Sequence, residues 1–425
     1  MKNQEKKGLK KGLRIFGKVL LSVIIAVVVC LIAVEIINSV LANKAISYIK
    51  NDIETVEFEN QKIPEKDSLG YYTFVTDEDL KVMQLTDIHI GGGFLSYERD
   101  IKAINSVAKM VQTEKPDLVV VTGDIAYPVP YPFPGAGTFN NKTGAKIFGN
   151  LMDKLGVYWA PVFGNHDTEL YSYFNREYMA KYYENHKYLK DGEKSYCLFQ
   201  SGEEDINGFG NYVVNVKNTQ GVITQSLFLM DTGSYVDGDY LGMEWKYDGI
   251  HADQMKWYEE TLNTFKAENE KLSADMPKSM MFFHIPFEEY ETAWSEFKEN
   301  DFKDTENVKY YYGELGELEG KVGNTLHPDE TFETLLRVGS TQAVFCGHDH
   351  LNNFSIEYKG IRLSFGYSID YLAYADIENF GLQRGCSIIN IKPDGSFDSH
   401  IENFYQDKYD FEDRDSAKLE KYSVD

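Results

Sequence analysis

From about residue 80 onward, short apolar runs alternate with longer charged stretches. The runs are rich in β-branched and aromatic residues, whereas stretches such as residues 251–269 place apolar residues at helical spacing. The runs span residues 81–85, 117–121, 157–163, 226–230, 279–283, 343–346, 361–365 and 387–391. Strands that alternate with helices in this way predict an α/β protein whose sheets are largely buried.

The N-terminal region has a different pattern, because residues 19–37 are apolar except for Ser22 and Glu35. A helix of this length spans roughly 28 Å, close to the thickness of a bilayer core. Residues 1–18 are basic, so we expect a single-pass protein of the cell membrane with a cytoplasmic N-terminus and an extracytoplasmic body. The alternative is a signal peptide cleaved near residues 40–42, which would give a secreted protein. Both interpretations export the body.

These patterns divide the chain into five segments. They are a basic cytoplasmic segment (1–18), a transmembrane anchor (19–41), a linker (42–76), a folded domain (77–405) and a charged C-terminal tail (406–425). Three insertions interrupt the folded domain, at residues 127–137, 168–211 and 296–326. Insertions of this length are solvated loops in most proteins, but they are also places where functional residues collect.

Charge and cysteine content narrow the class of protein further. The formal net charge is −24, which argues against a nucleic-acid partner because such proteins need a basic face. Of the four cysteines, Cys30 lies in the apolar N-terminal segment, and the three in the body do not form a disulfide framework. No protein partner is indicated by any of these patterns.

Five of the apolar runs end in Asp, Asn or His residues. Ligands of α/β sheets collect at the carboxyl ends of strands, so we expect these side chains to converge although they are far apart in the chain. The residues are Asp87, His89, Asp124, Asn165, His166, Asp167, His284, His348 and His350. Imidazoles and carboxylates are the usual ligands of borderline divalent metals. The set is too large for one tetrahedral ion but suits two ions, about 3.5–4 Å apart, that share a bridging carboxylate.

The motifs TDIH, TGD, GNHD, HIP and GHDH occur in the order found in calcineurin-like metallophosphoesterases, and residues 80–395 resemble that superfamily. The stretches GNYVVNV, LFLMDTGSY, FFHIPFEEY and FCGHDHLNNF are similar to its purple-acid-phosphatase-related branch. The resemblance implies that residues 77–405 form a four-layer α/β/β/α sandwich. It implies one metal held by Asp87, His89, Asp124 and His350, and a second held by Asp124, Asn165, His284 and His348. It also implies that His166 protonates the leaving group, and Asp167 is a candidate to orient it.

Tyr127 departs from the pattern of purple acid phosphatases. A Tyr three residues after the GD aspartate ligates ferric iron in those enzymes, which have Gly where this chain has His89. We therefore expect Tyr127 to line the cleft or pack against it rather than to bind metal.

The function predicted from these features is hydrolysis of small phosphate esters by two metal ions, each Mn, Fe, Zn or Mg. Phosphomonoesters are the expected substrates, and phosphodiesters are the alternative. A different class of function is a catalytically silent surface protein that uses the metals only to stabilise its fold. The membrane would be contacted through the N-terminal helix.

Overall fold

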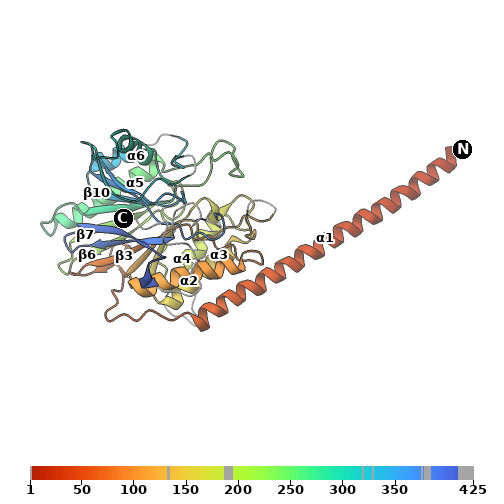
Figure 1. The fold of residues 1–425 in the computed structure, drawn as a ribbon, viewed down its shortest axis with the longest axis horizontal. Coiled ribbons are helices and arrows are strands. Elements are labelled where there is room, and N and C mark those ends of the chain that lie inside the picture. The colour runs from red at the N-terminus through yellow and green to blue at the C-terminus, as the bar shows by residue number, and fades with distance from the viewer. Residues whose placement is uncertain are drawn as a thin grey trace.

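The structure, a computed structural model, describes residues 2–131, 135–185, 195–317, 320–327, 330–374, 377 and 384–409. Residues 410–425, most of the predicted C-terminal tail, lie outside this set. The body contains two β-sheets that pack face to face, with helices on both outer faces (Figure 1).

The smaller sheet has the strand order β14-β13-β3-β4-β5. Its strands are β3 (Leu80–Leu85), β4 (Leu118–Thr122), β5 (Tyr158–Val162), β13 (Gly385–Ile391) and β14 (Phe397–Asn403). Strands β3, β4 and β5 are parallel, so their carboxyl ends lie at one edge. Helices α2 (Tyr97–Glu114) and α3 (Asn141–Leu155) supply buried residues to the core cluster that includes this sheet.

The larger sheet has the strand order β1-β2-β6-β7-β8-β10-β12-β11-β9. Its strands are β1 (Glu65–Lys66), β2 (Tyr72–Val75), β6 (Tyr212–Lys217), β7 (Ile223–Leu229), β8 (Lys278–Phe282), β9 (Val308–Tyr312), β10 (Thr341–Cys346), β11 (Ser355–Tyr358) and β12 (Ile361–Phe365). Strands β7, β8, β10 and β12 are parallel neighbours. Helices α5 (Ala252–Glu270), α6 (Glu289–Glu299) and α7 (Thr331–Val338) share a second core cluster with its outer face.

Strand β8 shows how the two cores are separated. Met280 and Phe282 belong to the core between the sheets, whereas Met281 and Phe283 belong to the core under the helices. Successive residues of a strand point to opposite faces, so a continuous apolar run is needed when both faces are covered. The predicted four-layer α/β/β/α sandwich is confirmed.

Helix α1 (Lys2–Asp52) extends away from the body, with the N-terminus at its far end (Figure 1). Within the described chain, residues Lys10–Asp52 form the helix that is long and apolar enough to cross a membrane. Its large apolar side chains from Val19 to Val40 are exposed, so the described body does not cover them.

The predicted linker, residues 42–76, is more ordered than its composition indicated. Its first part continues α1, and Ala45 and Ile49 are buried in the core that contains α2 and α3. Its last part forms β1 and β2, and β2 pairs with β6 in the larger sheet. The folded body therefore begins before residue 77.

The remaining short elements lie around the body. They are α4 (Arg176–Asn185) and the 3₁₀ helices η1 (His166–Thr168) and η4 (Asp407–Tyr409). The insertion at residues 168–211 contains α4, and the insertion at 296–326 contains β9.

Candidate metal centre

The predicted ligands come together where the parallel strands of both sheets end. Asp87 follows β3, Asp124 follows β4, His284 follows β8, and His348 and His350 follow β10. Asp87, Asp124 and His284 are completely buried, the side chain of His350 is 8% exposed, and His348 is partly buried. Buried carboxylates and imidazoles without compensation are costly, so their clustering indicates a site that binds cations.

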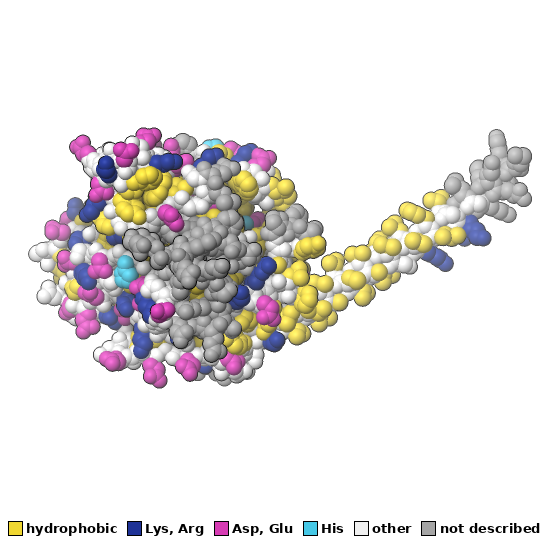
Figure 2. Space-filling view, viewed as in Figure 1, with side chains coloured by type: hydrophobic (Ala, Val, Ile, Leu, Met, Phe, Trp, Pro, Cys, Tyr) yellow, Lys and Arg dark blue, Asp and Glu magenta, His cyan; other side chains and the backbone are white. Residues whose placement is uncertain are grey.

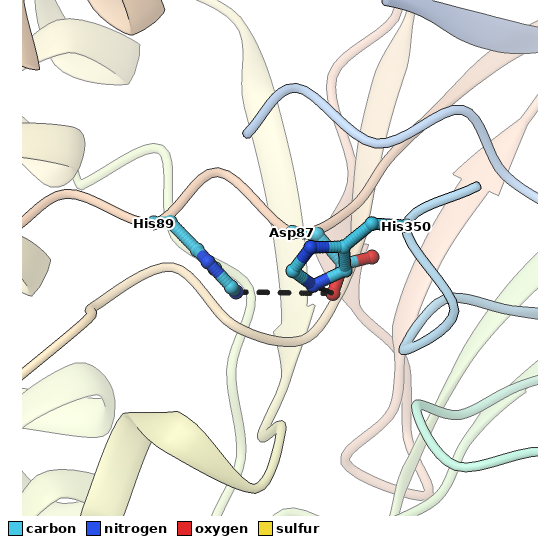
Figure 3. A group of neighbouring side chains, drawn as sticks. All are labelled: Asp87, His89 and His350. Atoms are coloured by element: carbon cyan, nitrogen blue, oxygen red, sulfur yellow. Dashed lines mark ion pairs between the residues drawn. The ribbon is translucent and has the colours of Figure 1, made fainter. Parts of the chain in front are cut away.

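One group consists of Asp87, His89 and His350, whose ligand atoms all lie within 4.8 Å of one another (Figure 3). The Nε2 atom of His350 lies 3.4 Å from Asp87 Oδ1, and the Nε2 atom of His89 lies 3.9 Å from the same oxygen. Asp87 Oδ1 is buried and has no hydrogen-bond partner among the described residues. Three converging ligands around one unsatisfied oxygen fit a metal ion.

A second group consists of Asp87, Asp124 and His284. Asp124 Oδ2 lies 3.2 Å from His89 Nε2 and 3.2 Å from His284 Nε2, so this carboxylate stands between the two groups. The Oδ1 atom of Asn165 lies 3.0 Å from His284 Nε2 and supplies a further oxygen. This arrangement fits two ions with Asp124 shared between them.

His348 takes a different position from the other imidazoles. Its ring packs edge-on against that of His284, with centroids 5.1 Å apart, and edge-on against Tyr247 at 4.2 Å. Its backbone N–H donates to Asp87 Oδ2 at 3.1 Å. Burial, together with the charge of His284, lowers the pKa of His348 well below its usual value, which keeps the ring neutral as a metal ligand must be.

Four residues at the strand ends have strained backbone conformations, which are common at functional sites. Asp87, His89, Asp124 and His348 all have positive φ, between 50° and 76°, although none is glycine. Such conformations cost roughly 1–3 kcal/mol each and cluster at functional sites. The glycine before Asp124 is required by space as well, because a Cβ on Gly123 would lie 2.4 Å from the imidazole of His284.

The electrostatics of the centre also indicate cations. Burial opposes ionisation of Asp124, but the neighbouring charges of His284 and His166 hold the pKa of its carboxyl well below the usual value. Burial likewise opposes protonation of His89 and His284, but carboxylates beside them raise both pKa values to about 9. Asp370 is the principal partner of His89, and Asp124 is that of His284. The buried carboxylates are thus stabilised by positive charge beside them. Bound metal ions would supply this charge in place of the protons on His89 and His284.

Asp370 is a functional residue that the motifs did not predict. Its Oδ2 lies 3.1 Å from Nδ1 of His350, and its Oδ1 lies 3.4 Å from Nδ1 of His89. Both histidines therefore keep Nε2 directed toward Asp87 and Asp124. A carboxylate behind a ligating histidine fixes the ring and raises its basicity. Its position in the loop after β12, away from every motif, gave no signal in a single sequence.

His166 is oriented by Glu169 rather than by Asp167. Its Nδ1 lies 2.7 Å from Glu169 Oε1, and its side chain remains about one-quarter exposed. Asp167 is turned inward, where its carboxylate accepts the backbone N–H groups of Asp124, Ala126 and Gly164. Asp167 therefore does not orient His166, although its adjacent position had suggested that it would. Its hydrogen bonds instead stabilise the loops that carry the candidate ligands.

Tyr127 packs beside the centre. Its ring stacks on His89, with centroids 4.7 Å apart, and meets the edge of His166 at 5.0 Å. Burial, with the charge of Asp370, raises the pKa of the phenol above its usual value. A phenol that stays protonated against two imidazoles acts as a wall of the site.

A cavity of about 330 Å³ adjoins the centre on the side of Glu169, and Leu170, Arg176 and Asp231 are among its lining residues. Arg176 could be considered as a phosphate ligand, but its guanidinium already donates to Asp231, to Ser234 Oγ and to the carbonyl of Gly164. These contacts indicate that Arg176 stabilises the loop that carries the GNHD motif.

A four-layer sandwich with a carboxylate and imidazole cluster at its strand ends defines the class of metal-dependent phosphoesterases. The sequence profile described as "Calcineurin-like phosphoesterase" matches residues 80–352. The chain therefore belongs to the calcineurin-like phosphoesterase family, and it is a hydrolase that acts on ester bonds.

Several known proteins are similar to this chain. "Probable inactive purple acid phosphatase 28" of Arabidopsis thaliana is 26% identical over 71% of this chain and 73% of its own length. "Phosphatase DCR2" of Saccharomyces cerevisiae is 29% identical over 66% of this chain and 46% of its own length. A solved structure of a dimetal phosphatase from Danio rerio covers 77% of this chain and 100% of its own, with 11% identity and a TM-score of 0.43. The Arabidopsis relative agrees with the purple-acid-phosphatase-related branch.

Proposed function

We propose that the chain is a two-metal phosphomonoesterase in which Asp124 bridges the ions. The observation that carries the proposal is the position of Asp124 Oδ2, 3.2 Å from an imidazole nitrogen of each metal group. The ligands would be Asp87, His89, Asp124 and His350 for one ion, and Asp124, Asn165, His284 and His348 for the other. Two such ions would lower the pKa of water and neutralise phosphate oxygens.

His166 is the proposed general acid. About one-quarter of its side chain is exposed, and Glu169 holds its Nδ1, so Nε2 is the nitrogen available to a leaving group. Proton donation of this kind contributes ~10²–10⁴-fold to a rate. Asp167 is proposed as a positioning residue, because it holds the backbone of Asp124.

The names of the Arabidopsis relatives describe those proteins as probable inactive phosphatases. In this chain every ligand position and the His166 position are filled, and the side chains converge. This completeness favours catalysis over the alternative of a metal-stabilised binding protein.

We also propose that α1 anchors the chain in the membrane with the body outside the cytoplasm. Four described basic residues, Lys10, Lys11, Arg14 and Lys18, precede the apolar stretch in the part of the helix far from the body (Figure 2), whereas two, Lys44 and Lys50, follow it. This excess on the N-terminal side favours a cytoplasmic N-terminus. A protease added outside intact cells should digest the body and leave the N-terminus protected; cleavage after residue 42 would instead release the body into the medium.

The test of the enzyme uses the full chain in detergent. After chelation, Mn, Fe, Zn or Mg is returned, metal content is counted, and p-nitrophenyl phosphate and bis-p-nitrophenyl phosphate are assayed. We expect metal-dependent hydrolysis with the monoester preferred, and loss of both activity and metal in Asp124→Asn. The control is Asp349→Asn, since Asp349 is also buried near the centre but bonds to Gly323 and Asn352. Two bound metals without hydrolysis of any ester would support the binding protein.

A further inference from the structure

The body touches α1 at the end of its apolar segment as well as beyond it. The hydroxyl of Tyr173 donates to Glu35 Oε1 at 2.8 Å, and the backbone N–H of Phe94 donates to Asn38 Oδ1 at 2.9 Å. The exposed apolar stretch runs from Val19 to Val40, roughly 33 Å of helix, so the outer boundary of a bilayer core would fall near these contacts. The loops of Phe94 and Tyr173 would then lie at the bilayer surface.

The body cannot turn freely about this helix, because the last turns of α1 are part of its core. Ala45 and Ile49 are buried, and the Tyr48 hydroxyl donates to Asn105 of α2 at 2.8 Å. The face of the body that meets the bilayer is therefore set by the fold itself.

That face carries apolar side chains that no other part of the described chain covers. Phe94 and Leu170, on the two loops that contact α1, are 63% and 69% exposed. Apolar side chains gather on the body where the helix leaves it and continue onto the helix surface (Figure 2). Contiguous exposed apolar surface of this kind marks an interaction site.

The loop between Tyr235 and Tyr247 adds a second apolar projection. Its tip exposes Tyr240, Leu241, Met243 and Trp245, the last three by 51%, 72% and 73%. The loop, green in Figure 1, projects on the side of the body from which α1 leaves. Exposure of four large apolar side chains within six residues is unfavourable in water and is typical of a segment that enters a membrane interface.

The tip of this loop is held in place rather than free. The buried carboxylate of Asp239 accepts the backbone N–H groups of Met243, Glu244 and Lys246 at 2.8 to 3.2 Å. The backbone N–H of Val236 donates to the carbonyl of Lys246 at 2.8 Å and closes the base of the loop. The apolar side chains are therefore presented by a fixed backbone.

The same three loops lead directly into the metal centre. The loop that ends at Phe94 begins with Asp87 and His89, and the loop that carries Leu170 and Tyr173 begins with His166. The third loop is bounded by Tyr235, whose hydroxyl bonds to Asn165 at 2.9 Å, and by Tyr247, which packs on His348. The three loops that expose these apolar side chains therefore also carry, or contact, residues of the centre.

From these observations we infer that the rim formed by Phe94, Leu170, Tyr173 and the loop 240–245 rests on the bilayer, and that the substrate is a phosphate ester carried by a membrane lipid. The inference rests on the proposed function and adds its substrate class. A lipid headgroup could enter the centre from the bilayer surface while its acyl chains stayed in the membrane.

Contact with lipid can be measured without any activity. The full chain is placed in phosphatidylcholine nanodiscs, one copy in each, with or without brominated acyl chains that quench tryptophan. Trp245 is highly exposed, whereas Trp159 and Trp257 are buried. We expect quenching that disappears in Trp245→Phe. Absence of quenching overturns the inference, and emission that depends instead on protein concentration in detergent shows that a second copy covers the loop.

The substrate class is tested in the same nanodiscs with phosphatidic acid, beside soluble glycerol 3-phosphate and p-nitrophenyl phosphate. We expect phosphatidic acid to be preferred over glycerol 3-phosphate, and the double change Leu241→Asp, Met243→Asp to lower that activity roughly tenfold. Hydrolysis of p-nitrophenyl phosphate should be unchanged. The matched control is Leu272→Asp, an equally exposed residue just after the C-terminal end of α5, at the sheet edge opposite the centre.

The outcomes separate the two proposals. Equal activity on phosphatidic acid and glycerol 3-phosphate, or an equal loss on both in the double variant, overturns the lipid substrate while the phosphoesterase stands. Failure of every ester to be hydrolysed with metal present is failure of the proposed function itself, and the quenching result remains interpretable.

Discussion

The imidazole of His166 is paired with Glu169, three residues along the chain, and not with its immediate neighbour Asp167. The distance from His166 Nδ1 to Glu169 Oε1 is 2.7 Å, and the hydroxyl of Tyr235 donates to the same oxygen at 3.3 Å. Glu169 is almost fully buried, so its carboxylate holds the ring in one orientation. If His166 is the general acid as proposed, this pair is the part of the centre that would govern proton transfer.

We predict that Glu169→Gln lowers kcat for an alkyl phosphate by about 10²-fold, because the imidazole loses the carboxylate that orients it and stabilises its charge. The loss should be smaller for p-nitrophenyl phosphate, whose leaving group departs without a proton. Steady-state kinetics on both esters measure the difference. Glu177→Gln, on the exposed face of α4, is the control. Equal losses on both esters would show that Glu169 only supports the fold.

Local geometry explains why Glu169 was missed from the sequence. Residues His166–Thr168 form a 3₁₀ helix, and in such a helix residues three apart lie on the same side. Asp167 was the candidate because it follows His166 directly in the motif GNHD. In a 3₁₀ helix, however, consecutive side chains point to different sides of the helix. The residue three positions away would have been the better prediction once the turn was recognised.

The convergence of the candidate ligands was predictable, because each follows an apolar run and parallel strands end at one edge of a sheet. Asp370 was not predictable in this way, since it reaches His89 and His350 from a loop without a motif. The strands β1 and β2 were also missed. They are short, and their exposed positions gave residues 65–75 the composition of a linker.

Asp370 gives a prediction about metal affinity. Its carboxylate lies behind both His89 and His350, so Asp370→Asn should weaken metal binding by ~10–100-fold through loss of ring orientation and basicity. Competition with a chromophoric chelator measures the affinity directly. Asp349→Asn serves as the control, because burial raises the pKa of the Asp349 carboxyl to about 8 and the group is already neutral at lower pH. Equal affinities in the two variants would contradict the role of Asp370.

Metal uptake should release protons. In the metal-free centre the pKa values of His89 and His284 are about 9, because Asp370 and Asp124 stabilise their protonated forms against the effect of burial. At neutral pH these rings are protonated, and a metal can bind only the neutral ring. Apparent affinity should therefore rise with pH until about 9 and then level off.

Calorimetry in two buffers of different ionisation enthalpy counts the protons released on titration with Zn or Mn. His251→Ala should release the same number as the unchanged chain, because His251 is an exposed residue at the start of α5 that pairs with Asp248. A heat of binding that does not depend on the buffer would show that the ligands are already neutral before the metal arrives.

A last prediction concerns Asp153, a buried carboxyl group whose ionisation would destabilise the folded chain. Asp153 lies in the last turn of α3, where the helix dipole disfavours an anion, and burial raises the pKa of its carboxyl from 3.8 to about 7. Between these values the unfolded chain is ionised and the folded chain is protonated, so unfolding releases a proton and stability falls as pH rises. Above about pH 7 the whole penalty, roughly 4 kcal/mol for a pKa raised by about three, is present.

Asp153→Asn removes this penalty, and the full chain in detergent should melt several degrees higher at about pH 8 but unchanged at about pH 4. Thermal unfolding of both proteins across this range measures the difference. Asp394→Asn is the control, because Asp394 is an exposed turn residue whose carboxyl pKa is lowered by its bonds to Ser396. A gain that is the same at both pH values would mean that packing of the amide, rather than loss of a buried charge, stabilises the variant.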